Sequence, residues 1–244
     1  MMESKTSCEV RAASKAAIYE RWKDKVALLA FGSRWQATPV EFIDALERIM
    51  EQYADEMGPY AVQITTQLVK KYQAMVTEDP NAEDDDEEEQ ILAATKCVTA
   101  IRRILEAVHK DKATMMEIMR IIYPVMMYSL TPDGLDSIDD GLDCINTCIY
   151  YGCSPDTRVP IELWKLLPQM MHITAGADND VDGGFAFEQL ALVANCLSNF
   201  IAKDPVTLMT VGPDQTETYF ALAVKFVQRV LVVNANGEHK QDGI

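Results

Sequence analysis

The chain has 244 residues, and 48% of them are hydrophobic, a share typical of a protein that buries a core rather than one that is wholly disordered. Lys and Arg number 22 against 38 Asp and Glu, which gives a formal net charge of −16. This charge argues against nucleic acid or an anionic membrane as the main partner, because both repel an acidic surface. We find no apolar run of membrane-spanning length and no signal sequence, so we expect neither a membrane protein nor a secreted one.

The six cysteines lack the spaced framework of a disulfide-bonded domain, which favours a reducing compartment. Cys144, Cys148 and Cys153 are the closest set, but their spacing matches no zinc motif and no histidine lies near them. The motifs of nucleotide-binding proteins, zinc proteases and serine hydrolases are absent from the chain. The sequence therefore predicts a protein that is not an enzyme and needs no cofactor.

Helical patterns follow one another along almost the whole chain. Residues 1–37 do not fit the later pattern, and we expect a lead-in or capping helix there that is partly disordered. From Thr38, a candidate N-cap, and Pro39 onward, apolar residues recur at helical spacing, and short β-branched runs do not alternate as strands would. Short connections pair these helices into antiparallel hairpins. The expected pairs are 39–54 with 59–76, 91–108 with 114–130, 135–152 with 160–174, and 185–202 with 216–233.

The first helices of these pairs begin at residues 39, 91, 135 and 185, which are 52, 44 and 50 residues apart. This irregular spacing is close to the ~40–47 residues of HEAT and armadillo repeats. Pro124 and Pro168 both fall inside second helices, where proline bends a helix. We therefore expect an all-α fold, an α-α superhelix of the HEAT/armadillo-like solenoid type. It would contain about four helical hairpins over residues 38–236, followed by a disordered tail at 237–244. A helical bundle is the alternative, but its loops would all be short.

A run of seven carboxylates is the feature best suited to binding, and we expect it in an acidic loop at 78–90. Adjacent like charges repel one another, so the run should be extended and solvated. It would attract basic ligands over a reach of about 8 Å, the screening length at physiological salt. The alternative is a linker that only adds solubility. The run consists of Glu83, Asp84, Asp85, Asp86, Glu87, Glu88 and Glu89.

A second candidate is the loop 178–183, which begins like a calcium-binding EF-hand loop. Asp178, Asp180 and Asp182 have the spacing of the first three ligands. The twelfth position requires a bidentate Glu but holds Gln189, so the pattern is incomplete. We expect no metal site, with these three aspartates as a weak calcium candidate and a polar turn as the better interpretation.

Three segments carry a resemblance to a known family: FIDALERIMEQYADEMGPYA at 42–61, the acidic run after it, and Ser154-Pro155 with LWKLLP at 163–168. They resemble the carboxyl half of the importin-beta (karyopherin-beta) superfamily, closest to its importin seven and eight branch. The resemblance extends over about residues 40–233, with features in the same order and helices of similar length.

This resemblance implies a HEAT-repeat segment of a nuclear transport receptor, which moves basic cargo proteins between cytoplasm and nucleus. The GTPase Ran and another importin would be further partners through a full-length receptor. Residues 1–37 depart from the family pattern, and a full receptor has many more repeats than this chain. Two alternatives stay open: a calcium-responsive helical protein that uses the 178–183 loop, and a stand-alone solenoid adaptor that docks another solenoid.

Overall fold

The computed structural model describes residues 58–77, 84–154, 156–176, 187–212 and 216–241. The chain divides into two units, Met1–Thr38 and Pro39–Ile244, and all described residues belong to the second. The lead-in helix expected at 1–37, the helix expected at 39–54 and the loop 178–183 lie outside the described residues.

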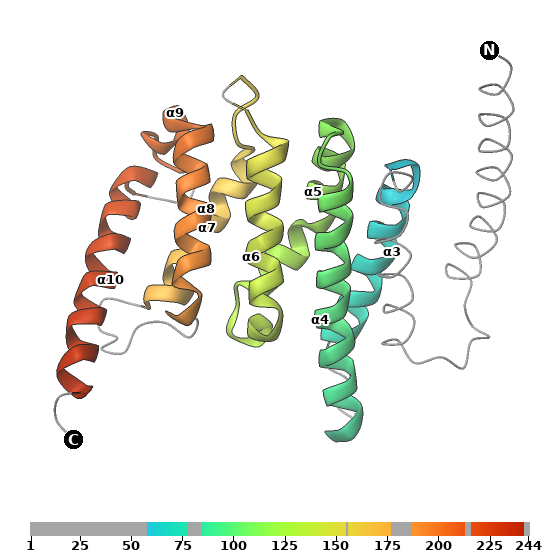
Figure 1. Ribbon diagram of the computed structural model, residues 1–244, viewed down its shortest axis with the longest axis horizontal. Helices are drawn as coiled ribbons and strands as arrows, with labels where there is room; N and C mark the ends of the chain where they lie inside the picture. Colours follow the sequence, from blue (N-terminus) through green and yellow to red (C-terminus); the bar gives the residue numbers. More distant parts are fainter. Residues whose placement is uncertain (1–57, 78–83, 155, 177–186, 213–215, 242–244) are drawn as a thin grey trace, which may run out of the picture. The chain divides into compact units, whose positions relative to one another are not determined.

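Helices make up nearly all of the described part of the chain (Figure 1). The described residues form no strand, and their β-type pairing is limited to an isolated antiparallel bridge between Val211 and Thr218. The all-α prediction is therefore confirmed. The α-helices are α3 (Gly58–Val76), α4 (Asp84–Ala107), α5 (Lys112–Ser129), α6 (Ile138–Thr147), α7 (Ile161–Ala175), α8 (Leu190–Lys203), α9 (Pro205–Leu208) and α10 (Tyr219–Gln241). Shorter turns are the 3-10 helices η2 (Pro132–Ser137) and η4 (Phe187–Gln189) and the π-helical turn η3 (Cys148–Gly152).

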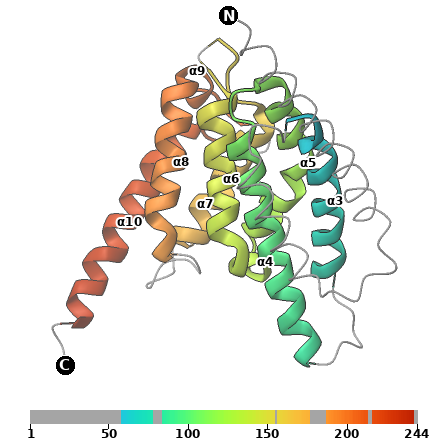
Figure 2. The same ribbon diagram turned by 45° about the vertical axis from the view of Figure 1, so that its right-hand side comes forward.

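The helices pack as a solenoid, in which each element contacts mainly its neighbours along the chain. The first helices of successive hairpins, α4, α6 and α8, lie side by side in that order, as the turned view also shows (Figure 2). Among the second helices, α3 contacts α5 and α7 contacts α10. This arrangement confirms the predicted helical solenoid. It arises because one amphipathic hairpin cannot bury its apolar face alone and must stack on the next.

Local sequence explains where α5 begins and how prolines affect the second helices α5 and α7. The Asp111 carboxylate accepts hydrogen bonds from the backbone N–H groups of Ala113 at 3.1 Å and Thr114 at 3.2 Å, and so caps the start of α5. Pro124 lies inside α5 and Pro168 inside α7, as the sequence predicted. Each proline removes one backbone hydrogen bond from its helix.

A small polar chain lies inside the packing of α3, η2 and α5. The hydroxyl of buried Ser129 donates to the Val125 carbonyl at 3.1 Å and lies 3.3 Å from the Ser137 hydroxyl. The Tyr72 hydroxyl lies 3.4 Å from the same Ser137 oxygen. Gly141 of α6 permits the close approach, because a Cβ atom there would stand 2.6 Å from the Ser129 Cβ.

Two predicted boundaries differ from the helix bounds. The acidic loop expected at 78–90 ends earlier, since α4 already begins at Asp84, while residues 78–83 lie outside the described residues. Carboxylates suit a helix start because they face the positive end of the helix dipole. Helix α10 continues to Gln241, into the range 237–244 where the sequence predicted a disordered tail. A helix that has nucleated gains one backbone hydrogen bond for each residue added.

Among the helices that the structure describes, none combines the length and the hydropathy that a membrane span requires.

Candidate functional site

The predicted acidic run lies mostly within a helix. Six of its residues, Asp84–Glu89, form the first turns of α4, and Glu88 is exposed to solvent. Glu83 lies outside the described residues. These residues therefore lie at the start of a helix that packs against α3 and α6, where the sequence predicted an extended loop.

The structure brings further carboxylates to the same side of the solenoid. The first helices α4, α6 and α8 start on the lower side of Figure 1, so the residues at their starts face one edge. The Thr95 hydroxyl of α4 lies 3.4 Å from the carbonyl oxygen of Asp136 in η2, which places the acidic start of α6 beside α4. We call this surface the acidic edge. It consists of Asp84–Glu89, Asp136, Asp139, Asp140, Asp143 and Glu188.

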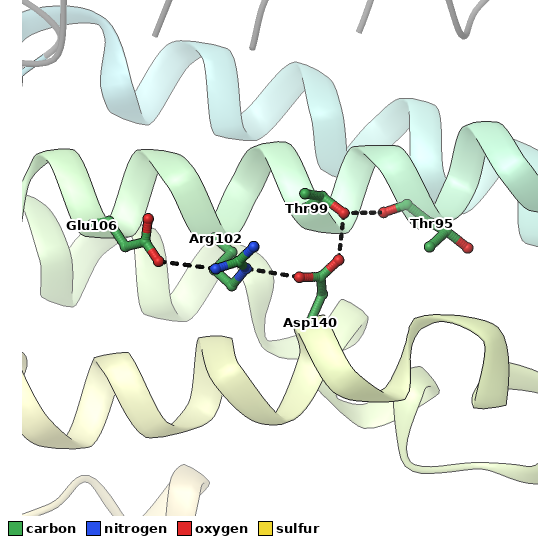
Figure 3. Close-up of polar contacts among 5 residues, drawn as sticks. All are labelled: Thr95, Thr99, Arg102, Glu106 and Asp140. Carbon is green, nitrogen blue, oxygen red and sulfur yellow. Dashed lines mark hydrogen bonds and ion pairs between the residues drawn. The ribbon is translucent and has the colours of Figure 1, made fainter. Parts of the chain in front are cut away.

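Asp140 anchors α6 to α4 through a polar network (Figure 3). One carboxylate oxygen accepts a hydrogen bond from Arg102 Nε at 2.7 Å, and the other accepts one from the Thr99 hydroxyl. Arg102 also donates to Glu106 at 3.0 Å, one helical turn further along α4. Burial opposes the Arg102 charge, but the Asp140 carboxylate outweighs this and raises the pKa of the guanidinium. Asp140 is therefore a structural member of the acidic edge.

Other members of the acidic edge carry charge that is poorly stabilised. Desolvation, together with the carboxylates of Asp140 and Glu188, raises the pKa of Asp139. Desolvation also raises the pKa of Asp143, and the nearby Arg102 only partly offsets it. Both shifts mean that the ionised form of these groups costs free energy in the folded protein. A cation that approached the acidic edge would lower these pKa values and remove part of that cost.

The prediction from sequence named only the run at 83–89 and missed five of these residues. Asp136, Asp139, Asp140 and Asp143 are interrupted by Ser137, Ile138, Gly141 and Leu142, and Glu188 stands alone in the sequence, so none of them belongs to a run longer than the pair Asp139-Asp140. The signal that could have found them is their position, since each lies in or just before the first turns of a predicted first helix. Equivalent positions in a stack of hairpins meet along one edge.

Metal-binding and nucleophilic chemistry find little support in the described residues. No group of three or more His, Cys, Asp and Glu side chains there could hold a metal ion. The calcium candidate Asp178, Asp180 and Asp182 lies outside this part of the chain. All five described cysteines are buried, and burial raises the pKa of Cys153 to about 11 and of Cys196 to about 12. Thiols with such pKa values are largely protonated at neutral pH and are weak nucleophiles.

Two curated proteins are similar to this chain. It is 29% identical over 126 residues to the Importin beta-like SAD2 homolog of Arabidopsis thaliana, in an alignment that covers 52% of this chain and 12% of that protein. It is 23% identical over 138 residues to the Probable importin-7 homolog of Dictyostelium discoideum, which covers 57% of this chain and 12% of that protein. The alignments therefore span only a small part of either relative.

No family model and no solved structure matches the chain. The resemblance that the sequence suggested is nevertheless confirmed by both relatives: over about half its length, this chain is similar to proteins of the importin-beta superfamily.

Proposed function

We propose that this chain is a protein-binding helical-repeat segment of the kind found in nuclear transport receptors, and that its acidic edge binds basic cargo proteins. The protein acts by binding and not by catalysis. It acts in the cytoplasm and the nucleus. Ran and another importin are its partners through a full-length receptor. The acidic run Glu83–Glu89 and the neighbouring starts of α6 and α8 together form the cargo-binding surface.

The observation that carries this proposal is the alignment of carboxylates at the starts of three successive first helices. A single acidic run gives only local attraction, because exposed ion pairs contribute about 0–1 kcal/mol each. Carboxylates on α4, α6 and α8 offer several such contacts to one extended basic surface. The raised pKa values of Asp139 and Asp143 add a driving force, since a bound cation stabilises their ionised forms.

The direct test measures binding of a lysine-rich histone to a variant with three of these carboxylates neutralised. The edge variant combines Asp136→Asn, Asp139→Asn and Glu188→Gln, all at exposed residues outside the network of Asp140. We expect its affinity at low salt to fall by about tenfold, because three weak contacts are lost. The difference should shrink as salt rises and screens the interaction. Isothermal titration calorimetry at two salt concentrations gives both values.

A matched control separates the acidic edge from the overall charge. Glu117→Gln, Asp156→Asn and Glu162→Gln also remove three exposed carboxylates, but at the other end of the hairpins, near the starts of α5 and α7. The control should bind the histone within about twofold of the wild type. Equal losses in both variants would mean that only net charge matters, and an unchanged affinity of the edge variant would overturn the proposal.

A further inference from the structure

The exposed apolar side chains of the described residues gather at one end of the solenoid. Thirteen large hydrophobic side chains are exposed in the described part of the chain, and eight of them lie between residues 201 and 231. Monomeric proteins usually scatter such residues singly, while a contiguous apolar patch marks an interaction site. This end of the stack therefore has the character of an interface.

One helix carries the core of this patch. Phe220, Val224, Val227 and Leu231 of α10 are 47%, 40%, 50% and 63% exposed. We call these four residues the α10 stripe. Their spacing of four, three and four residues places them on one face of the helix, over a length of about 17 Å. The same alternation of three and four residues forms the seam of helices that pair along their length.

The other face of α10 is already used. Tyr219, Ala223 and Phe226 are buried, and α10 contacts α7 and α9. The ring centroid of Tyr219 lies 4.7 Å from that of Trp164 in α7. Helix α10 is therefore held on the solenoid by one apolar face, and the α10 stripe is a second apolar face that is exposed. The stripe lies on the side where a further hairpin of the stack would pack.

Charge decides which partner suits this face. The protein carries a net charge of −16, so two copies repel each other across most surfaces. Thr218 and residues 219–231 of α10 contain no Asp or Glu. Their two cations are engaged within the chain, since Lys225 pairs with Glu217 and Arg229 donates to the Ala175 carbonyl at 3.3 Å. The α10 stripe is therefore a face across which two such acidic molecules can approach.

We propose that the α10 stripe binds the α10 stripe of a second copy of this chain, with the two helices antiparallel about a two-fold axis. The spacing is self-complementary in that geometry. Phe220 would meet Leu231 of the second copy, and Val224 would meet Val227, so large side chains face each other at the ends and smaller ones at the centre. A two-fold contact of this kind uses the same patch on both molecules and closes at the dimer.

Sedimentation velocity of the complete chain tests this proposal, at protein concentrations up to roughly 10⁻⁴ M. The wild-type protein should sediment as a dimer at the upper end of this range. Val224→Glu with Val227→Glu should weaken the dimer by at least tenfold, because carboxylates would face each other in an apolar contact. Both side chains are at least 40% exposed, so the helical circular dichroism and the melting temperature should stay close to those of the wild type.

The control carries the same two added charges elsewhere. Leu92→Glu with Ile161→Glu changes exposed apolar residues of α4 and α7 and should leave the dimer intact. Raising the salt concentration should strengthen an apolar dimer of two acidic molecules, because it screens their repulsion. A wild-type monomer at every concentration, a dimer that survives the Val224 and Val227 changes, or a dimer that dissociates with salt would each overturn the proposal.

Discussion

Replacing Trp164 with alanine is expected to lower the free energy of unfolding by about 3–5 kcal/mol, the cost of removing a large aromatic side chain from a packed core. Trp164 of α7 is completely buried. Its ring centroid lies 4.6 Å from that of Phe200 in α8 and 4.7 Å from that of Tyr219 in α10. The side chain therefore joins three helices of two hairpins, and few neighbours can move to fill the space that it leaves.

Denaturant unfolding followed by circular dichroism measures this loss. Tyr150→Ala serves as the control, since Tyr150 is 51% exposed and its loss should cost less than about 1 kcal/mol. A loss of less than about 1 kcal/mol for Trp164→Ala would contradict the packing described for α7, α8 and α10.

The second large effect is expected at Asp204, a buried carboxylate between two hairpins. Asp204 is 1% exposed and caps α9 by accepting a hydrogen bond from the Thr207 N–H at 3.0 Å. Its other oxygen accepts a hydrogen bond from the N–H of Val159, in the loop before α7, at 3.3 Å. Replacement by alanine removes both acceptors and leaves a buried N–H without a partner. We expect a cost of about 2–4 kcal/mol in unfolding free energy, from the lost cap and the charged hydrogen bond together.

Asp111→Ala is the matched control, because Asp111 caps α5 in the same way but is exposed. It should cost about 1 kcal/mol, the usual value for an exposed helix cap. Equal losses for Asp204→Ala and Asp111→Ala would mean that the Val159 contact contributes nothing.

The stability contributed by Asp204 should also depend on pH. Burial would raise its pKa, but the hydrogen bonds from Thr207 and Val159 outweigh burial and hold the pKa below the ordinary value of 3.8. A carboxyl group with a lowered folded-state pKa stabilises the protein above its unfolded-state pKa, and this contribution is lost as the pH falls through the folded-state value. Melting temperatures measured from neutral pH down to acid should therefore fall less steeply for Asp204→Asn than for the wild type.

The sequence predicted the helical hairpins well because their signals are local. Apolar spacing marks α5, α7 and α10 without knowledge of their neighbours, and Pro124 and Pro168 fall inside the helices expected for them. The short helix α9 was not predicted, because its four residues are too few to show a period. The π-helical turn Cys148–Gly152 was not predicted either, because a single turn of five residues is also too short to show a period.

The candidate site was only partly predictable, for a physical reason. A run such as Glu83–Glu89 stands out in composition and was interpreted as a solvated loop, although carboxylates also favour a helix start and six of its residues open α4. The carboxylates of Asp139 and Glu188 are 49 positions apart in the sequence and interact only because α6 and α8 lie side by side. Their proximity follows from the stacking of hairpins, which sets which helix starts share an edge. Spacing along the chain does not contain this information.

The central claim is that basic proteins bind along the acidic edge, and nuclear magnetic resonance of the labelled protein tests it most directly. Backbone amide shifts would be followed while a lysine-rich histone-tail peptide is added at low salt. We expect the largest changes at the starts of α4, α6 and α8, including Asp139 and Glu188, and their disappearance at high salt. Changes confined to the starts of α5 and α7, around Glu117 and Glu162, would contradict the claim.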